Sequence, residues 1–281
     1  SAIDAIAAAL ELPHNKHLQA LADRLRSGYS HRAAIEDALS NYRGTVTPRL
    51  LADFARIHSK DTGIELDPKR MLSTSGNTQA IKAMLEYYDK LGIPVAVFCA
   101  RPTYAGFLAP LAYTKNIRLY SVKTDGLGMK AGHLEHQVNQ AIQDGFMPGF
   151  LYVVPDGSNP KGTTMSQGRR DDIYTVAVQT FVKSPQGLII LEDVPYHFIR
   201  YGDGPFPALM AANDPAGIVA YAFSTSKIGI PDERTGVFHV PMDLHLPKGG
   251  KAPLIKEMVV SVAAGTLMHS ATALAKFTGQ L

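Results

Sequence analysis

Residues 150–192 read FLYVVPDGSNPKGTTMSQGRRDDIYTVAVQTFVKSPQGLIILE and decide the fold class. The stretch begins with the continuous apolar run FLYVVP (150–155) and ends with a second such run, GLIILE (187–192). Between the two runs, apolar residues recur at helical spacing, at Ile173, Val176, Ala177 and Phe181. Strands that are apolar throughout are buried on both faces, and a helix between two of them is typical of a parallel β–α–β unit.

The same alternation extends in both directions along the chain. Further apolar runs are VAVFCA (95–100), IRLYSV (117–122), IVAYAFS (218–224) and TGVFHV (235–240), and helical spacing recurs at Ile81, Met84, Leu85 and Tyr88. We therefore expect an α/β fold with a mostly parallel, seven-stranded sheet sandwiched by helices. Earlier leucines at spacings of three and four predict an N-terminal helical segment, 1–62, followed by a large domain, 63–281.

The composition is that of an ordinary globular protein. The formal net charge is +3, and 46% of the 281 residues are apolar. No basic arm or run indicates nucleic acid as a partner, and no apolar stretch approaches the ~18 residues of a spanning helix, so no membrane partner is expected. The single cysteine, Cys99, lies in an apolar run, which favours a buried structural role and a cytoplasmic location over disulfide chemistry.

In open parallel sheets, ligands bind beyond the carboxyl ends of the strands, so the residues after each run are informative. The segment 73–79 contains Gly76 and Asn77 where a helix opens, which fits either a phosphate cradle or an ordinary capped turn. Tyr104 follows 95–100, and it could stack on a flat heterocycle or serve as a core or surface tyrosine.

Later strand ends carry more polar chemistry. Asn159 lies in an Asn-Pro-x-Gly turn, which is good loop chemistry and could also present an amide to a ligand. Asp193 ends a buried strand, where an acid is costly unless it has a partner such as a protonated pyridine nitrogen. Lys227 follows the run 218–224 among small hydroxyl residues, and Arg234 beyond it could bind a phosphate through two hydrogen bonds.

These motifs, in this order, resemble the fold-type I pyridoxal-phosphate enzymes, the aspartate aminotransferase superfamily of class I and II aminotransferases. The run Ser226-Lys-Ile-Gly-Ile-Pro231, with Arg234-Thr-Gly236, is most similar to the valine–pyruvate and aromatic aminotransferase branches. The resemblance covers about 42–275 and implies transfer of an amino group between an amino acid and a 2-oxo acid, with pyridoxal 5'-phosphate as cofactor.

The resemblance also implies a role for each matching residue. Lys227 would carry the cofactor as a Schiff base, and Asp193 would pair with its ring nitrogen. Tyr104 would stack on the ring, while Asn159 and Tyr196 would hydrogen-bond its hydroxyl. The residues that would hold the phosphate are Gly76, Asn77, Ser224, Ser226 and Arg234. Tyr42 would reach the phosphate of a partner subunit, in a homodimer.

The chain departs from the family pattern in three places. Lys161 stands where the family turn has threonine, and Asp232 and Glu233 follow Pro231 where the family has glycine; both changes are expected to place charge near the phosphate. The small C-terminal domain that usually carries the arginine for the substrate carboxylate is missing from the pattern, so that arginine and the substrate's side chain cannot be named.

Other readings remain open. The same cofactor residues serve lyases, decarboxylases and amino-acid oxidases, because the fold does not fix the reaction. A cofactor-binding sensor or an inactive partner subunit is a further alternative, although no DNA-binding helix pair is visible in the sequence. Product analysis separates a transaminase, which returns an oxo acid, from a lyase, which releases a fragment.

Overall fold

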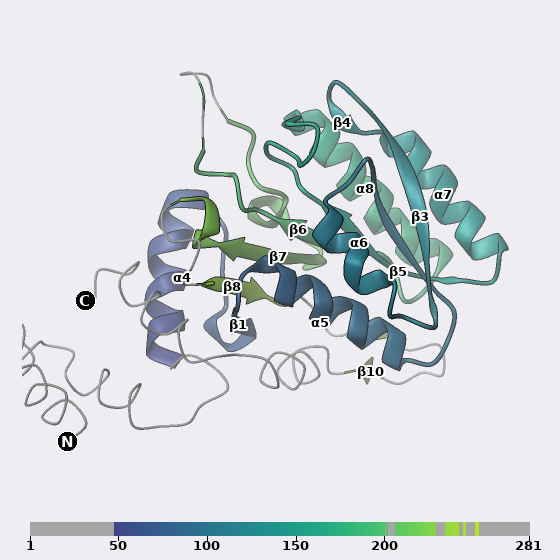
Figure 1. The fold of residues 1–281 in the computed structure, drawn as a ribbon, viewed down its shortest axis with the longest axis horizontal. Coiled ribbons are helices and arrows are strands. Elements are labelled where there is room, and N and C mark those ends of the chain that lie inside the picture. The colour runs from purple at the N-terminus through teal and green to yellow at the C-terminus, as the bar shows by residue number, and fades with distance from the viewer. Residues whose placement is uncertain are drawn as a thin grey trace, which may run out of the picture.

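The computed structural model describes residues 48–199, 201, 206–228, 234–241, 244–245 and 251–252. Its main feature is an eight-stranded sheet in the order β1-β8-β7-β6-β5-β2-β3-β4, with helices on both faces (Figure 1). The strands are β1 (Met71–Thr74), β2 (Val95–Arg101), β3 (Ile117–Asp125), β4 (Gly128–Met129), β5 (Met147–Val153), β6 (Ile189–Asp193), β7 (Val219–Ser224) and β8 (Gly236–His239). Two further short strands, β9 (Leu244–His245) and β10 (Lys251–Ala252), pair with each other.

The sheet is mostly parallel, as the sequence predicted. β3, β2, β5, β6 and β7 pair in parallel, whereas β8 runs antiparallel between β7 and β1. The expected strand count of seven is wrong by one, because β4 adds a two-residue antiparallel edge to β3. A strand this short, after the turn at Asp125–Leu127, has no periodicity that a sequence could reveal.

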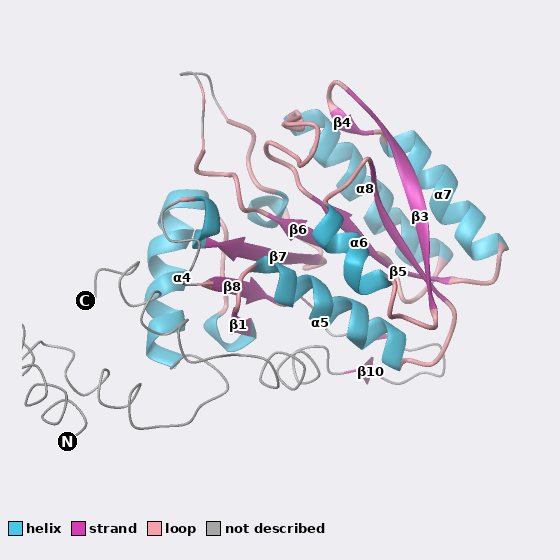
Figure 2. Ribbon diagram, in the orientation of Figure 1, coloured by secondary structure: helices cyan, strands magenta, loops and turns pink. Residues whose placement is uncertain are grey.

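The helices form a layer on each side of the sheet (Figure 2). They are α4 (Pro48–Thr62), α5 (Asn77–Lys90), α6 (Ala105–Leu111), α7 (Ala131–Gln143) and α8 (Gln167–Lys183), with the 3-10 turns η1 (Pro68–Arg70), η2 (Met210–Asn213) and η3 (Thr225–Lys227). α5 contacts α6, and α7 contacts α8. Crossover connections between parallel strands are right-handed, and the strand order reverses between β2 and β5. Helices α5 and α6 therefore cover one face of the sheet, and α7 and α8 cover the other.

The pairing of β2 with β5 contains a close approach that requires glycine. The register shifts between Ala96 and Val97, so that Gly149 is the extra residue of a bulge. A Cβ at Gly149 would lie 2.6 Å from Cγ1 of Val95 and 3.1 Å from the carbonyl oxygen of Ala96. Only a residue without a side chain lets the two central strands approach this closely.

Apolar side chains fill both layers. The larger cluster lies between the sheet and α5, α6, α7 and α8, and a second one joins α4 to the sheet through Phe54, Tyr221 and Phe223. Tyr42 and the rest of 1–47 lie outside the described residues. Within the part of the chain that the structure describes, no helix is long and apolar enough to cross a membrane.

Candidate functional site

A cleft of about 130 Å³ opens at the carboxyl ends of the central strands. This is where ligands bind in open α/β sheets, and it lies close to the point where the strand order reverses. The cleft is lined by Asn77, Thr78, Tyr104, Tyr152, Val154, Asn159, Asp193, Pro195, Tyr196, Ser224, Ser226, Lys227 and Arg234.

Asp193, the last residue of β6, is the buried acid of the cleft and is only 3% exposed. The side-chain amide of Asn77 donates to its Oδ1 over 2.6 Å, and the hydroxyl of Tyr152 donates to its Oδ2 over 2.6 Å. Burial raises the pKa of Asp193 to about 6, although both hydrogen bonds favour the charged form. A carboxylate held in this way and facing a cleft would favour a cationic donor.

Asn77 contributes a second acceptor beside this carboxylate. Its amide nitrogen also donates to the carbonyl oxygen of Ala222 over 3.1 Å, so both of its protons are directed at the sheet. Its Oδ1 is buried and has no hydrogen-bond partner among the described residues. A buried acceptor without a donor is costly, and a ligand N–H would satisfy it.

Two cationic side chains enter the cleft from the far end of β7 and the start of β8. Lys227 ends η3 and is exposed, and Arg234 lies just before β8. The guanidinium of Arg234 donates over 3.4 Å to Oγ of Ser226 and over 3.4 Å to the carbonyl oxygen of Ser75. Among the described residues, no carboxylate forms an ion pair with either cation.

The amino end of α5 faces Arg234. Gly76 precedes the helix with φ +74, a left-handed conformation that glycine adopts without strain. A Cβ at this position would lie 2.7 Å from Nη2 of Arg234. The bare backbone therefore admits the guanidinium to a helix amino terminus, and the two together favour an anion such as phosphate.

Aromatic and amide groups form the remaining wall. Tyr104 precedes α6, Asn159 lies in the loop after β5, and Tyr196 follows β6. Burial raises the pKa of the Tyr196 hydroxyl, and a hydrogen bond with Asn159 opposes this shift. The two polar groups that the sequence proposed for one ligand oxygen are therefore neighbours.

The structure gathers most of the predicted site residues. The cleft is lined by Asn77, Tyr104, Asn159, Asp193, Tyr196, Ser224, Ser226, Lys227 and Arg234, and Gly76 lies against Arg234. Tyr42, Asp232 and Glu233 lie outside the described residues. Among the described residues, no group of histidine, cysteine and acidic side chains could hold a metal ion.

Sequence reasoning missed Tyr152. It stands inside the apolar run 150–155, where a tyrosine is expected to be core, and its ring stacks on Phe107 at 4.2 Å between centroids. Only the pairing of β5 with β6 brings its hydroxyl within hydrogen-bond distance of Asp193. In a buried sheet strand, a hydroxyl-bearing aromatic next to the strand end is the signal that could have identified it.

Lys161, which was expected to place charge near the phosphate, does not line the cleft that contains Lys227 and Arg234. Its Nζ donates to Oγ1 of Thr124 over 3.0 Å and to the carbonyl oxygen of Asp125 over 3.3 Å. It lines a neighbouring cavity with Thr124 and not the cleft of Lys227 and Arg234. Lys161 therefore ties the loop of Asn159 to the end of β3.

Several curated proteins that are similar to this chain are aminotransferases. No protein-family model matches the chain. The aromatic-amino-acid aminotransferase 1 of Thermococcus litoralis is 30% identical over 166 residues, which are 59% of this chain and 37% of that protein. The (S)-3,5-dihydroxyphenylglycine transaminase of Amycolatopsis orientalis is 27% identical over 239 residues, which are 84% of this chain and 51% of that protein.

Solved structures agree on the fold. The kynurenine aminotransferase of Pyrococcus horikoshii superposes with a TM-score of 0.69 at 21% identity, over 97% of this chain and 69% of that structure. This likeness establishes the large-domain fold. The chain spans about a third to a half of the length of the curated relatives cited above. These similarities do not show the valine–pyruvate branch that the sequence suggested.

Proposed function

We propose that this chain, a homologue of the class I, fold-type I aminotransferases, is the cofactor-binding part of a pyridoxal-phosphate-dependent enzyme that transfers an amino group between an amino acid and a 2-oxo acid. One observation carries the proposal: a lysine and a buried carboxylate, Lys227 and Asp193, line the same cleft. The cleft also holds the guanidinium of Arg234, which forms no ion pair among the described residues and lies beside a helix amino terminus; this arrangement suits the phosphate of that cofactor.

The residues present fit this cofactor group by group. Gly76, Ser224, Ser226 and Arg234 would bind the phosphate. Asn77, which the resemblance placed with them, instead directs its side-chain amide at Asp193 and at the carbonyl oxygen of Ala222. Asp193 and the unsatisfied Oδ1 of Asn77 would receive a protonated ring nitrogen. Tyr104 would cover the ring, and Asn159 and Tyr196 would donate to its hydroxyl.

The chemistry divides between cofactor and protein. When bound, pyridoxal phosphate supplies an electron sink for a bond broken at the substrate α-carbon. Asp193 would favour a protonated ring nitrogen, because its negative charge would stabilise that positive form. The amine of Lys227 would hold the cofactor covalently and, once released, its Nζ would accept and return the proton of the α-carbon.

Labelling of Lys227 tests the proposal directly. The purified chain is titrated with pyridoxal phosphate while the visible absorption is followed, then reduced with borohydride and digested for mass spectrometry. We expect a visible absorption band and one modified lysine, Lys227. Modification spread over several exposed lysines, or no modification, would contradict the assigned site.

Products decide the reaction class. Incubation with single amino acids and a 2-oxo acid should yield a new oxo acid and a new amino acid in equal amounts. Release of ammonia with a fragment of the side chain would indicate a lyase, and carbon dioxide would indicate a decarboxylase. Hydrogen peroxide with the oxo acid would indicate an oxidase, and binding without turnover would favour a sensor or a partner subunit.

Gly76→Ala should weaken cofactor binding. An alanine at φ +74 and ψ 174 costs about 1–3 kcal/mol of stability, and its methyl group would also displace the guanidinium of Arg234, which lies 2.7 Å from the Cβ position. We expect the dissociation constant for pyridoxal phosphate, measured by absorption titration, to rise at least about tenfold, the effect of losing one charged hydrogen bond.

Gly92→Ala is the matched control for this substitution. Gly92 has φ +67, and a Cβ there would meet nothing within 4 Å. Both variants should therefore unfold at lower temperature, but only Gly76→Ala should bind cofactor poorly. Equal affinities in the two variants would show that Arg234 does not hold the phosphate.

We also propose the division of the chain at residues 62 and 63 and a homodimer in solution. Light scattering of the purified chain, with and without cofactor, tests the second point. A monomer that binds cofactor at Lys227 would show that cofactor binding does not require a dimer. Tyr42 would then have no role at the phosphate of a partner subunit.

A further inference from the structure

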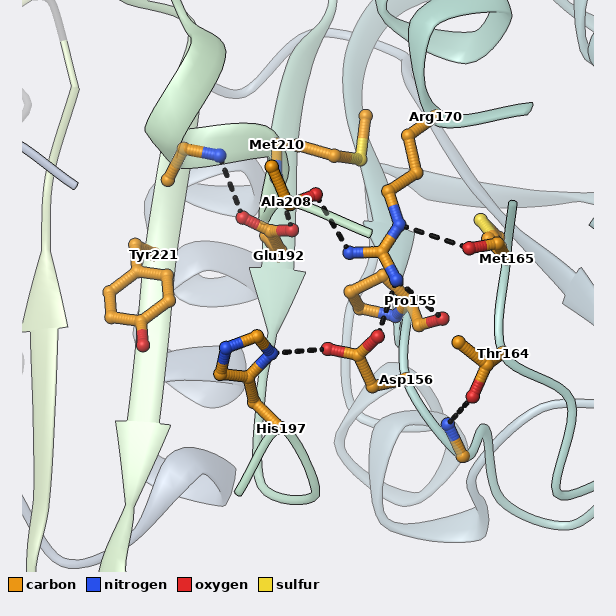
Figure 3. Close-up of polar contacts among 12 residues, drawn as sticks. Pro155, Asp156, Thr164, Met165, Arg170, Glu192, His197, Ala208, Met210 and Tyr221 are labelled. Carbon is orange, nitrogen blue, oxygen red and sulfur yellow. Dashed lines mark hydrogen bonds and ion pairs between the residues drawn. The ribbon is translucent and has the colours of Figure 1, made fainter. Parts of the chain in front are cut away.

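A second buried polar cluster contains none of the residues assigned to the cofactor (Figure 3). Its centre is Asp156, which is 2% exposed. One carboxylate oxygen accepts from the guanidinium of Arg170, and the other lies 2.8 Å from Nδ1 of His197. Arg170 is 1% and His197 is 3% exposed, so three titratable side chains meet away from water.

Arg170 fastens both ends of the loop that carries Asn159. Its guanidinium donates to the carbonyl oxygen of Pro155 over 3.4 Å, at the start of the loop, and to that of Met165 over 3.2 Å, at the end. A further bond of 3.0 Å reaches the carbonyl oxygen of Ala208. One buried, planar guanidinium thus fixes these three carbonyl groups relative to one another.

Backbone hydrogen bonds within the loop also join its two ends. The backbone N–H of Met165 donates to the carbonyl oxygen of Pro155 over 2.8 Å, and that of Ser158 donates to Thr163 over 2.9 Å. Asn159 stands next to Ser158, at the mouth of the cleft. Its position therefore depends on the geometry set at the base of the loop.

His197 connects the same carboxylate to the second loop. It directly follows Tyr196, whose hydroxyl lies close enough to Asn159 for the amide to affect its pKa. The loops after β5 and β6 therefore meet at two places, at Asn159 and Tyr196 in the cleft and at the bond between Asp156 and His197. Figure 3 shows the bonds from Arg170 to Asp156 and from Asp156 to His197, the residue that follows Tyr196 in the chain.

Stability alone is a poor reason for this cluster. Buried ion pairs seldom stabilise a fold more than apolar residues of the same size would, because each charge loses its hydration. A second acid, Glu192, lies close enough to interact with Arg170 and Asp156, and burial raises its pKa to about 7. It is held by the backbone N–H groups of Met210 and Ala211, over 2.7 and 2.9 Å. Directional bonds of this kind fix positions, which is what a binding site needs.

We propose that Arg170, Asp156 and His197 are positioning residues. They hold Asn159 and Tyr196 where both side chains can hydrogen-bond the ring hydroxyl of the cofactor. The inference rests on the proposed function for the identity of the ligand. The coupling of the two loops is a property of the protein without ligand and can be measured separately.

Two substitutions at His197 test the coupling. His197→Leu removes the bond to Asp156, whereas His197→Asn keeps an N–H near the position of Nδ1. Hydrogen exchange of the protein without cofactor is followed in peptides covering 155–165 and 195–201. We expect His197→Leu to raise the exchange rate in both peptides at least about tenfold, with peptides from α5 unchanged, and His197→Asn to restore much of the protection.

The bound cofactor provides the second readout. In His197→Leu, the visible absorption should titrate at a different pH from wild type, and the dissociation constant should rise about tenfold, because the donors to the ring hydroxyl are no longer fixed. Tyr174→Phe, which removes a 2.7 Å bond between Tyr174 on α8 and Asp214, is the control for a general loss of stability and should change neither quantity.

The outcomes separate the two proposals. If wild type binds no cofactor at Lys227, the proposed function fails, and the exchange rates alone decide whether the loops are coupled. If cofactor binds but His197→Leu leaves exchange in 155–165 at the wild-type rate, the positioning role is overturned. A titration that is unchanged in His197→Leu despite faster exchange would also overturn it, because the loops would then move without affecting the ligand.

Discussion

Lys227→Ala is expected to eliminate covalent cofactor binding and to lower turnover by at least about 10⁴-fold, the scale seen when a nucleophile or base is deleted. Lys227 is exposed in the cleft, so its removal leaves no cavity and should change the free energy of unfolding by no more than about 0.5 kcal/mol. The fold and the other contacts to the cofactor should survive the substitution.

The measurement combines borohydride trapping with a turnover assay. Lys183→Ala is the matched control, since Lys183 is also exposed and its Nζ donates to Glu135 and Asn139 on α7, outside the cleft. We expect Lys183→Ala to behave as wild type, while Lys227→Ala retains weak, non-covalent binding through Arg234 and Asp193. A Lys227→Ala protein that is still labelled at one site would mean that another lysine is the anchor.

The fold was largely predictable because its signal is repeated. Each buried strand is a continuous apolar run, and the runs at 150–155 and 187–192 became β5 and β6 within two or three residues. The two-residue β4 was not predictable, because its pairing with β3 depends on the turn between them and not on a pattern in its own residues.

The cleft was predictable where a polar residue stands out against its surroundings. Asp193 and Lys227 interrupt apolar segments at strand ends, so their chemistry is visible in the sequence. Tyr152 was hidden because it continues an apolar run, and its role depends on reaching Asp193 across the sheet.

Arg170 was hidden for a different reason. It stands in Arg169-Arg170-Asp171-Asp172, a charged run that is typical of a solvated helix face. The helix buries Arg170, at 1% exposure, and leaves its neighbour Arg169 partly exposed, at 15% of the side chain. Which of two adjacent arginines is buried depends on how α8 packs against the sheet, and local composition does not record that.

Asp193→Asn should reduce turnover by about a hundredfold or more while increasing the stability of the protein without cofactor at neutral pH. The loss of turnover follows from the lost charge, because a neutral amide cannot keep the ring nitrogen protonated as a carboxylate does. The hydrogen bonds can largely persist, since an amide oxygen accepts from Asn77 and an amide nitrogen can donate to Tyr152.

The gain in stability follows from proton linkage. Burial raises the pKa of Asp193 to about 6, so the folded state keeps a proton that the unfolded chain loses near the ordinary pKa of 3.8. The free energy of unfolding therefore falls as the pH rises from about 4 to about 6, by up to about 3 kcal/mol at 1.36 kcal/mol per pKa unit. Asparagine carries no proton to lose and escapes this decrease.

Denaturant unfolding of both proteins at pH 4 and pH 7, with and without pyridoxal phosphate, measures the effect. Burial raises the pKa of Glu192, and this residue is present in both proteins, so the difference between their free energies of unfolding reports on Asp193. Without cofactor, we expect similar stability at pH 4 and a more stable Asp193→Asn protein at pH 7. With cofactor, wild type should gain more, because its carboxylate then faces the cation it favours. A wild type that is more stable than Asp193→Asn at pH 7 without ligand would show that Asp193 is already paired with a cation of the protein, and would remove it from the cofactor site.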